Sequence, residues 1–214
     1  QSRDKIDFLE ITADHFLQSP TVRWRFLDKL CSQYTLIPHG LNLSLGSAEG
    51  LNLEYLNDLI ELIKYVKPPW WSEHIAFTKA GEIEIGHLSP LAFNRESIGA
   101  FCENVNKVQD KIETPLILEN ITYNIDLPWN EMEENKFLGE ILDRTGCGLL
   151  LDVTNLFINA KNHDYDPIQF LETIPAERII QLHFVGGMIK EGKWIDNHCE
   201  NTQDDIFMLI ESVL

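Results

Sequence analysis

Several short apolar segments of this chain end in a side chain that can bind a metal ion. Three of these side chains are imidazoles, others are acids in PLILEN and GLLLDVTN, and an acid–imidazole pair follows in IDNH. Mixed imidazole and carboxylate ligands suit iron, manganese or zinc better than magnesium or calcium. Burying so many polar groups is costly unless a cation compensates them. The series, in chain order, is His39, His74, Glu119, Asp152, Asn155, His183, Asp196 and His198.

The spacing within this series favours ions that share ligands. Glu119 lies near its middle, and two carboxylate oxygens make it the natural bridge between two ions. Asp152 and Asn155 are three residues apart, so both face one pocket if a helical turn follows the strand. Asp196 and His198 alternate on an extended segment, which puts them on the same side. The sequence therefore predicts a multinuclear metal centre.

Each of these residues alone has an ordinary structural interpretation. A histidine at a strand end is more often hydrogen-bonded than metal-bound, and an acid after a strand often caps a helix. Their joint occurrence favours the metal interpretation. We further predict that Asp14, His15 and Asn120, which also follow strand-like segments, contact substrate, and that His163 is a solvated loop residue.

Strand-like and helix-like segments alternate along the chain and position these residues. Six strands are expected, within residues 6–12, 36–46, 70–77, 115–120, 148–155 and 179–184. Helices are expected over residues 20–33, 53–66, 94–112, 130–144, 166–174 and 204–214, with a loop over 81–93. Asn52 is a predicted N-cap and Pro68 a predicted stop for the second helix.

This alternation predicts an α/β fold with a parallel sheet and crossover helices. An open doubly wound sheet usually gathers its site at one switch point, whereas here nearly every strand ends in a ligand. That pattern favours a (β/α)8 TIM-type barrel. Such barrels usually need about 250 residues, so we expect residues 1–214 to be a single barrel domain that lacks the first and last strands.

The composition of the chain limits the classes of partner that it can bind. The net charge is −17 and the basic residues are scattered, which disfavours a nucleic-acid partner. No apolar stretch approaches the roughly 18 residues of a membrane span, and no signal segment opens the chain. The four cysteines have no CxxC spacing. We expect a cytoplasmic protein with reduced thiols and no membrane partner.

At its ligand segments the chain resembles a known family, the MbnB/TglH-type multinuclear non-haem iron enzymes, which modify cysteines in ribosomally made peptides. The resemblance spans almost the whole chain in the family's order. It implies a barrel related to the xylose-isomerase-like ones, and two or three iron ions for which zinc or manganese can substitute. The matching stretches are FLEITADHF, PHGLNLSLGS, SEHIAF, LSPLAFNRESI, LILENITY, LLLDVTNLFINAKNHDYDP, LHFVGG and IDNH.

The resemblance also implies how the ligands are shared. The first ion takes His39, His74 and Glu119, the second takes Glu119, Asp152 and His183, and the third takes Asn155, Asp196 and His198. In such barrels the second ion takes a further Glu from the last strand, which this sequence does not contain. The family often has His-x-x-Gly-His where this chain has Gly187 at the last position.

The leading hypothesis is an iron-dependent oxidase of peptide natural product biosynthesis. It would use O2 to modify a cysteine in a precursor peptide, and the resemblance implies a partner protein that presents the peptide. The alternative on the same barrel is a divalent-metal-dependent sugar isomerase, or a phosphodiesterase or endonuclease-like hydrolase, in which the ions polarise a carbonyl or activate water. A catalytically inactive binding scaffold is a third class, which the intact ligand series disfavours.

Overall fold

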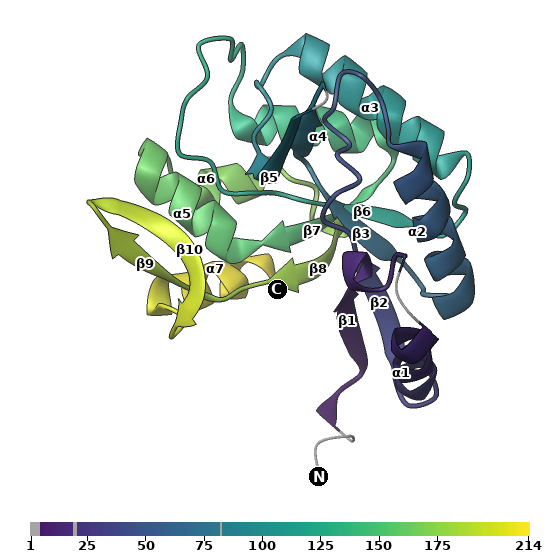
Figure 1. The fold of residues 1–214 in the computed structure, drawn as a ribbon. Coiled ribbons are helices and arrows are strands. Elements are labelled where there is room, and N and C mark those ends of the chain that lie inside the picture. Colours follow the sequence, from purple (N-terminus) through teal and green to yellow (C-terminus); the bar gives the residue numbers. More distant parts are fainter. Residues whose placement is uncertain (1–4, 19–20, 82) are drawn as a thin grey trace.

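Six parallel strands form one curled sheet at the centre of the molecule (Figure 1). The computed structural model describes residues 5–18, 21–81 and 83–214. The strand order in the sheet follows the order along the chain, as in a TIM-type barrel. The strands are β1 (Phe8–Thr12), β2 (Thr35–His39), β3 (Trp71–His74), β6 (Leu116–Glu119), β7 (Gly148–Asp152) and β8 (Ile179–His183). The six predicted strands and the predicted fold class are confirmed.

The register of the sheet aligns the carboxyl ends of the strands. His74 on β3 is paired with Glu119 on β6, and Asp152 on β7 is paired with His183 on β8. His39, the last residue of β2, is paired with Ser72 on β3. Paired residues on neighbouring strands lie side by side, so the register gathers the ends of β2 to β8 along one rim of the sheet.

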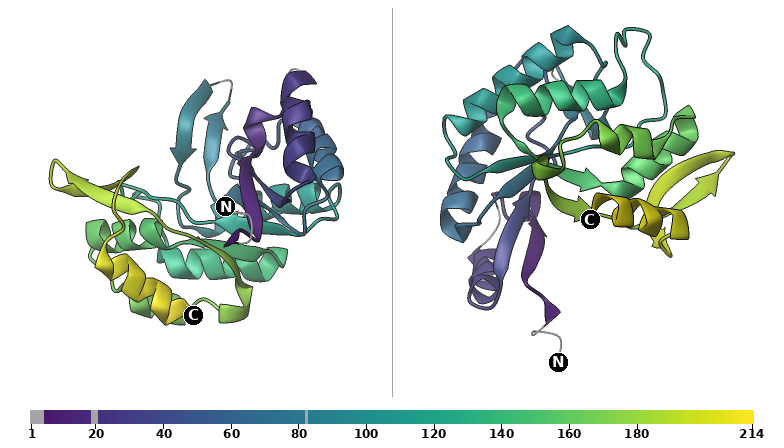
Figure 2. Two further views of the ribbon diagram at one scale, coloured as in Figure 1. Left: turned by 90° about the horizontal axis from the view of Figure 1, so that it is seen from below. Right: turned by 180° about the vertical axis from the view of Figure 1, so that it is seen from behind.

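The helices follow the strands along the chain and cover the sheet from outside (Figures 1 and 2). Leu56, Leu59 and Leu62 form part of the buried face of α2, and Asn52 caps this helix as predicted, accepting from the backbone of Glu54 and Tyr55. The six predicted helices are confirmed: the second has its predicted bounds and the ends of the others differ by up to four residues. The helix at residues 153–163 was not predicted, and Pro20 lies outside the described residues. The helices are α1 (Thr21–Cys31), α2 (Leu53–Val66), α3 (Arg95–Gln109), α4 (Glu134–Thr145), α5 (Val153–His163), α6 (Pro167–Glu172) and α7 (Asp204–Val213).

Two β-hairpins project away from the central sheet (Figure 2). One pairs β4 (Phe77–Ala80) with β5 (Ile83–Ser89), so the predicted loop over residues 81–93 is wrong in its first part. The other pairs β9 (Gly186–Lys190) with β10 (Lys193–Glu200) and carries Asp196 and His198. Two short 3-10 helices, Ala13–His15 and Ala176–Arg178, complete the described elements. In the part of the chain that the structure describes, no helix is both long and apolar enough to cross a membrane.

Candidate metal centre

His39, His74 and Glu119 meet at the rim of the sheet. Each offers a ligand atom, and these atoms lie within 4.8 Å of one another. Glu119 Oε2 lies 3.3 Å from Nε2 of His39 and 3.1 Å from Nε2 of His74. This oxygen is buried, yet it has no partner with hydrogen-bond geometry. Lone pairs that gather around one point without bonding each other fit a cation at that point.

The two imidazoles are held by their other nitrogens. His39 Nδ1 lies 2.7 Å from the Ser72 hydroxyl, and His74 Nδ1 lies 3.0 Å from the Gly40 carbonyl oxygen, to which it donates. A Cβ at residue 40 would overlap the buried Glu73 carboxylate, which explains the glycine that follows His39. Fixing Nδ1 leaves Nε2 of both rings directed at Glu119, the arrangement that metal-binding histidines use.

A second set of potential ligands shares Glu119 with the first. Glu119, Asp152 and His183 also bring their ligand atoms within 4.8 Å of one another. Glu119 Oε1 lies 3.0 Å from Nδ1 of His183, while its Oε2 faces the first set. The structure therefore brings together five of the eight predicted ligands around one carboxylate.

Asp152 is placed by the start of α5. Its Oδ1 accepts from the backbone N–H of Asn155 at 2.8 Å, so it is the N-cap of the helix. The Asn120 amide holds the Asp152 backbone on both sides, accepting from its N–H at 2.9 Å and donating to its carbonyl at 3.0 Å. Asp152 thus serves as helix cap and candidate ligand together.

The neighbouring acids and burial shift the pKa values of the three imidazoles in different directions. Burial favours the neutral ring, but the Glu119 carboxylate outweighs it and raises the pKa of His74 to about 10. Burial acts the same way on His183, where the Glu10 and Glu119 carboxylates raise the pKa to about 10. In His39 burial dominates, and the pKa is lowered despite Glu119. The raised pKa values of His74 and His183 show how strongly the surrounding carboxylates favour positive charge at this place.

The carboxyl groups of Glu119 and Asp152 differ in the direction of their pKa shifts. Burial would raise the pKa of Glu119, but the neighbouring His183 and His74 imidazoles hold it below its usual range. Burial, together with the negative charge of Glu119, raises the pKa of Asp152 to about 7. Two buried carboxylates this close are both ionised only when positive charge stands between them.

The third predicted set is only partly assembled. Asp196 Oδ2 accepts from His198 Nε2 at 2.8 Å, and the negative charge of Asp196 contributes to the raised pKa of Asp152. Asn155 Oδ1 and Asp196 Oδ1 are buried without a hydrogen-bond partner. The His198 side chain is 69% exposed and its backbone is left-handed, with φ 54°. A third ion at these residues stays a prediction.

The sequence analysis missed one acid at the centre. Glu10, in the middle of β1, places Oε2 2.9 Å from Nε2 of His183 and 2.6 Å from Nε2 of Gln181. Its signal in the sequence is an acid within the apolar strand FLEIT. Side chains alternate along a strand, so Glu10 lies on the face opposite to that of Leu9 and Ile11. It lies within a strand rather than after one, so a search of strand ends passes over it.

Two of the three residues predicted to contact substrate, Asp14 and Asn120, have side chains held by structural partners. Asp14 accepts from the backbone N–H of Leu41 and from the side chain of Asn42, which ties the first 3-10 helix to the loop after β2. His15 is exposed. Asn120 is buried, with both ends of its amide on the Asp152 backbone. Their contact with substrate stays a prediction.

The curled parallel sheet, with its strands in chain order and helices outside it, has the fold of a TIM-type barrel. The chain is similar to a solved D-tagatose 3-epimerase-like protein, with a TM-score of 0.61, 16% identity and coverage of 98% of this chain and 78% of that one. It is also similar to a 3-keto-D-glucoside 4-epimerase from E. coli, with TM-score 0.59, 12% identity and coverage of 98% and 78%. It spans 64% of the length of a similar D-psicose 3-epimerase. At such identities the likeness shows the fold alone.

The chain belongs to the RiPP precursor modification enzyme family MbnB/TglH/ChrH, whose model matches residues 1–214. A UPF0276 protein of Caulobacter vibrioides is 33% identical over 210 residues, which are 98% of this chain and 75% of that protein. A UPF0276 protein of Vibrio parahaemolyticus is 32% identical over 215 residues, with coverage of 99% and 75%. The predicted family is confirmed, and with it membership in a family of enzymes that modify ribosomally made precursor peptides.

Proposed function

We propose that this chain is an iron-dependent oxidase that uses O2 to modify a cysteine of a ribosomally made precursor peptide, together with a peptide-presenting partner protein. Membership in the precursor-modifying family supports the substrate class. The observation that carries the metal part of the proposal is Glu119, one buried carboxylate shared by two sets of His and acid side chains.

The donor set fits iron. His39 and His74 with Glu119, and His183 with Glu119 and Asp152, supply imidazole and carboxylate but no thiolate, as iron, manganese and zinc sites do. The unbonded Glu119 Oε2 is the buried polar atom that such an ion would satisfy. Bound iron would supply a position for the substrate thiolate and the electrons that reduce O2.

The residues around the ligands hold protons at defined atoms. With an ion bound, Glu10 would accept the proton on Nε2 of His183, which would leave the Nδ1 lone pair on the side of Glu119. Ser72 and the Gly40 carbonyl act in the same way on His39 and His74. These partners fix ring orientation and increase the basicity of the ligand nitrogen.

Metal analysis and thiolate binding test the proposal. We expect anaerobically purified protein to contain iron, and a cysteine peptide added to it to give a thiolate-to-iron absorption band that a serine peptide of the same sequence does not give. We also expect O2 uptake to depend on the cysteine peptide. Zinc alone at full occupancy, with neither the band nor O2 uptake after addition of Fe(II), would rule out the oxidase and favour an isomerase or hydrolase.

A further inference from the structure

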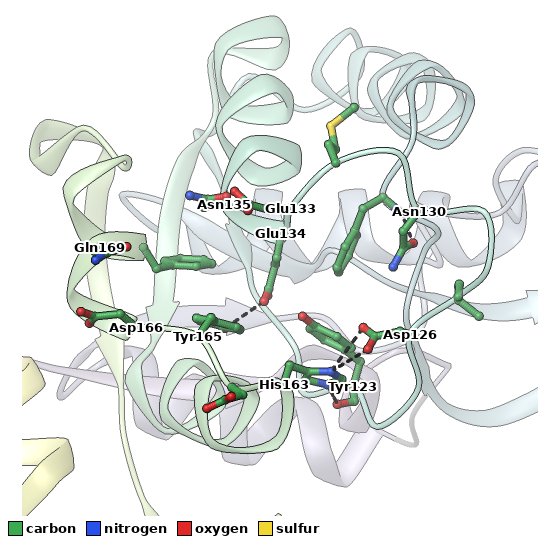
Figure 3. A pocket seen from close by; sticks show the side chains of 15 residues that line it. Tyr123, Asp126, Asn130, Glu133, Glu134, Asn135, His163, Tyr165, Asp166 and Gln169 are labelled. Carbon is green, nitrogen blue, oxygen red and sulfur yellow. Dashed lines mark hydrogen bonds and ion pairs between the residues drawn. The ribbon is translucent and has the colours of Figure 1, made fainter.

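A cavity of about 530 Å³ opens beside the barrel, between the loop of residues 121–133, α4, the end of α5 and α6 (Figure 3). The candidate metal ligands do not line it. Its wall contains aromatic rings and acids from three separate parts of the chain, Phe93, residues 123–135 and residues 163–170, so its composition is not that of one surface loop.

The aromatic rings form flat, mutually supported surfaces. Tyr123 stacks on His163 with ring centroids 4.1 Å apart, and Phe93 packs edge-on against Tyr123 at 5.3 Å. On the opposite side Tyr165 stacks on Phe170 at 5.9 Å. Ring contacts of this kind hold the faces in place, and the face of an aromatic ring attracts a cation.

A buried carboxylate without a positive partner lies at the base of the cavity. Glu134 is 8% exposed, and its oxygens accept from the Tyr165 hydroxyl at 3.1 Å and from the Asn159 amide at 3.3 Å. Figure 3 shows its carboxylate directed toward Tyr165. No ion pair of Glu134 is found among the described residues, and burial raises its pKa to about 7. A buried carboxylate is stabilised by a cation in contact with it.

The other residues that line the cavity also favour a cationic ligand. Four further acids line the cavity. Of these, Glu133 pairs with Lys136 outside it and Asp126 lies 3.3 Å from Nδ1 of His163. No Lys or Arg of the described residues lines the cavity. The whole chain carries a net charge of −17, which attracts a basic ligand to such a site. The further acids are Asp126, Glu133, Asp164 and Asp166.

We propose that this cavity binds the guanidinium group of an arginine in the peptide substrate, an inference that rests on the proposed function for its peptide. A planar guanidinium stacks on aromatic faces and donates to a carboxylate in a way that a compact ammonium does not. The cavity and the metal-type cluster lie at opposite ends of α5, since Asp152 caps its start and His163 is its last residue. Eleven helical residues span about 16 Å, which an extended peptide covers in about five residues. Because α5 is buried along most of its length, a peptide cannot follow its axis, and the arginine would lie at least about five residues from the cysteine.

An NMR titration of the 15N-labelled protein with acetyl-Gly-Gly-Arg-Gly-Gly-amide tests this. We expect saturable shifts at His163 and Tyr165, and about tenfold weaker binding of the same peptide with citrulline, the neutral isostere of arginine. Agmatine tests for a free small guanidine instead of a peptide. Tighter binding of agmatine than of the peptide, equal binding of the citrulline peptide, or no saturation with the arginine peptide would each overturn the proposal.

Matched variants locate the binding. Glu134→Gln keeps the shape and removes the charge, and Gln169→Lys places a competing ammonium on an exposed lining residue, where folding is unaffected. Both variants are expected to bind the arginine peptide about tenfold or more weakly than the unaltered protein. Glu103→Gln makes the same change in the exposed pair with Lys107 on α3 and should leave binding unchanged. Unaltered binding in both cavity variants would contradict the assignment.

The same titration separates this inference from the proposed function. Glu119→Gln alters the candidate metal ligands and leaves the cavity lining intact, so the metal-free forms of this variant and of the unaltered protein should bind the arginine peptide equally. Absence of iron chemistry in the unaltered protein, with the arginine peptide still bound, would count against the oxidase alone.

Discussion

Replacing Glu119 by Gln is expected to empty both ion positions at the strand ends. The substitution preserves the shape of the side chain but removes the charge that His39, His74 and His183 surround. Even partners of metal ligands usually contribute 10- to 100-fold to affinity, so loss of a shared ligand should cost roughly 100-fold or more at each position. Elemental analysis of the anaerobically purified variant measures the loss.

Two comparison variants make this result specific. Glu134→Gln removes an equally buried carboxylate away from the cluster and should retain all bound metal. His74→Ala removes a ligand of the first set only, so it should lose one ion and keep the one beside Asp152. Metal content that is unchanged in Glu119→Gln, or equally reduced in Glu134→Gln, would remove the shared carboxylate from the metal proposal.

Asn120→Ala is expected to combine a loss of stability with a loss of metal. Its amide is bonded to both the N–H and the carbonyl of Asp152, and both backbone groups are left without these partners when it is removed. We expect the free energy of unfolding to fall by about 2–4 kcal/mol. The freed backbone should also misplace the Asp152 carboxylate and weaken the ion of the second set. Chemical denaturation and metal analysis measure the two effects.

Asn104 provides the matched control for this clamp. It is equally buried on α3, where its amide donates to the carbonyls of Leu45 and Ser47, away from the cluster. Asn104→Ala should lose a similar amount of stability but no metal. Equal metal loss in both variants would mean that general destabilisation, not the position of Asp152, releases the ion. Normal metal content with weaker peptide binding in Asn120→Ala would instead support the predicted substrate contact.

The ligands at the carboxyl ends of the strands could be predicted from the sequence because each strand is recognisable from its own residues. His39, His74 and Glu119 follow apolar segments, and in parallel strands the carboxyl ends share one edge. The helical faces could be predicted in the same way, since Asn52 and the leucines of α2 form a local pattern. To predict that the ligands converge, only the type and order of these strands and helices had to be known.

Features that depend on contacts between distant segments were not predicted. Glu10 is within reach of His183, 173 residues later, only because the sheet curls. Helix α5 starts directly at Asp152, where the sequence LLLDVTNL continues the apolar strand without a break. His163 was predicted to be a solvated loop residue, but it stacks on Tyr123, which is 40 residues earlier in the chain. The partner in each case is absent from the local sequence.

The double role of Asp152 has a thermodynamic consequence. Its carboxylate caps α5, whose last residue, His163, lines the acidic cavity, so one helix has a candidate ligand at its start and a candidate peptide contact at its end. An ion that orders the start of the helix and a peptide that orders its end would each lower the ordering cost of the other. Reciprocity then requires that metal raise peptide affinity by the same factor by which peptide raises metal affinity. The enzyme would thereby hold its ions most tightly when a substrate is in place.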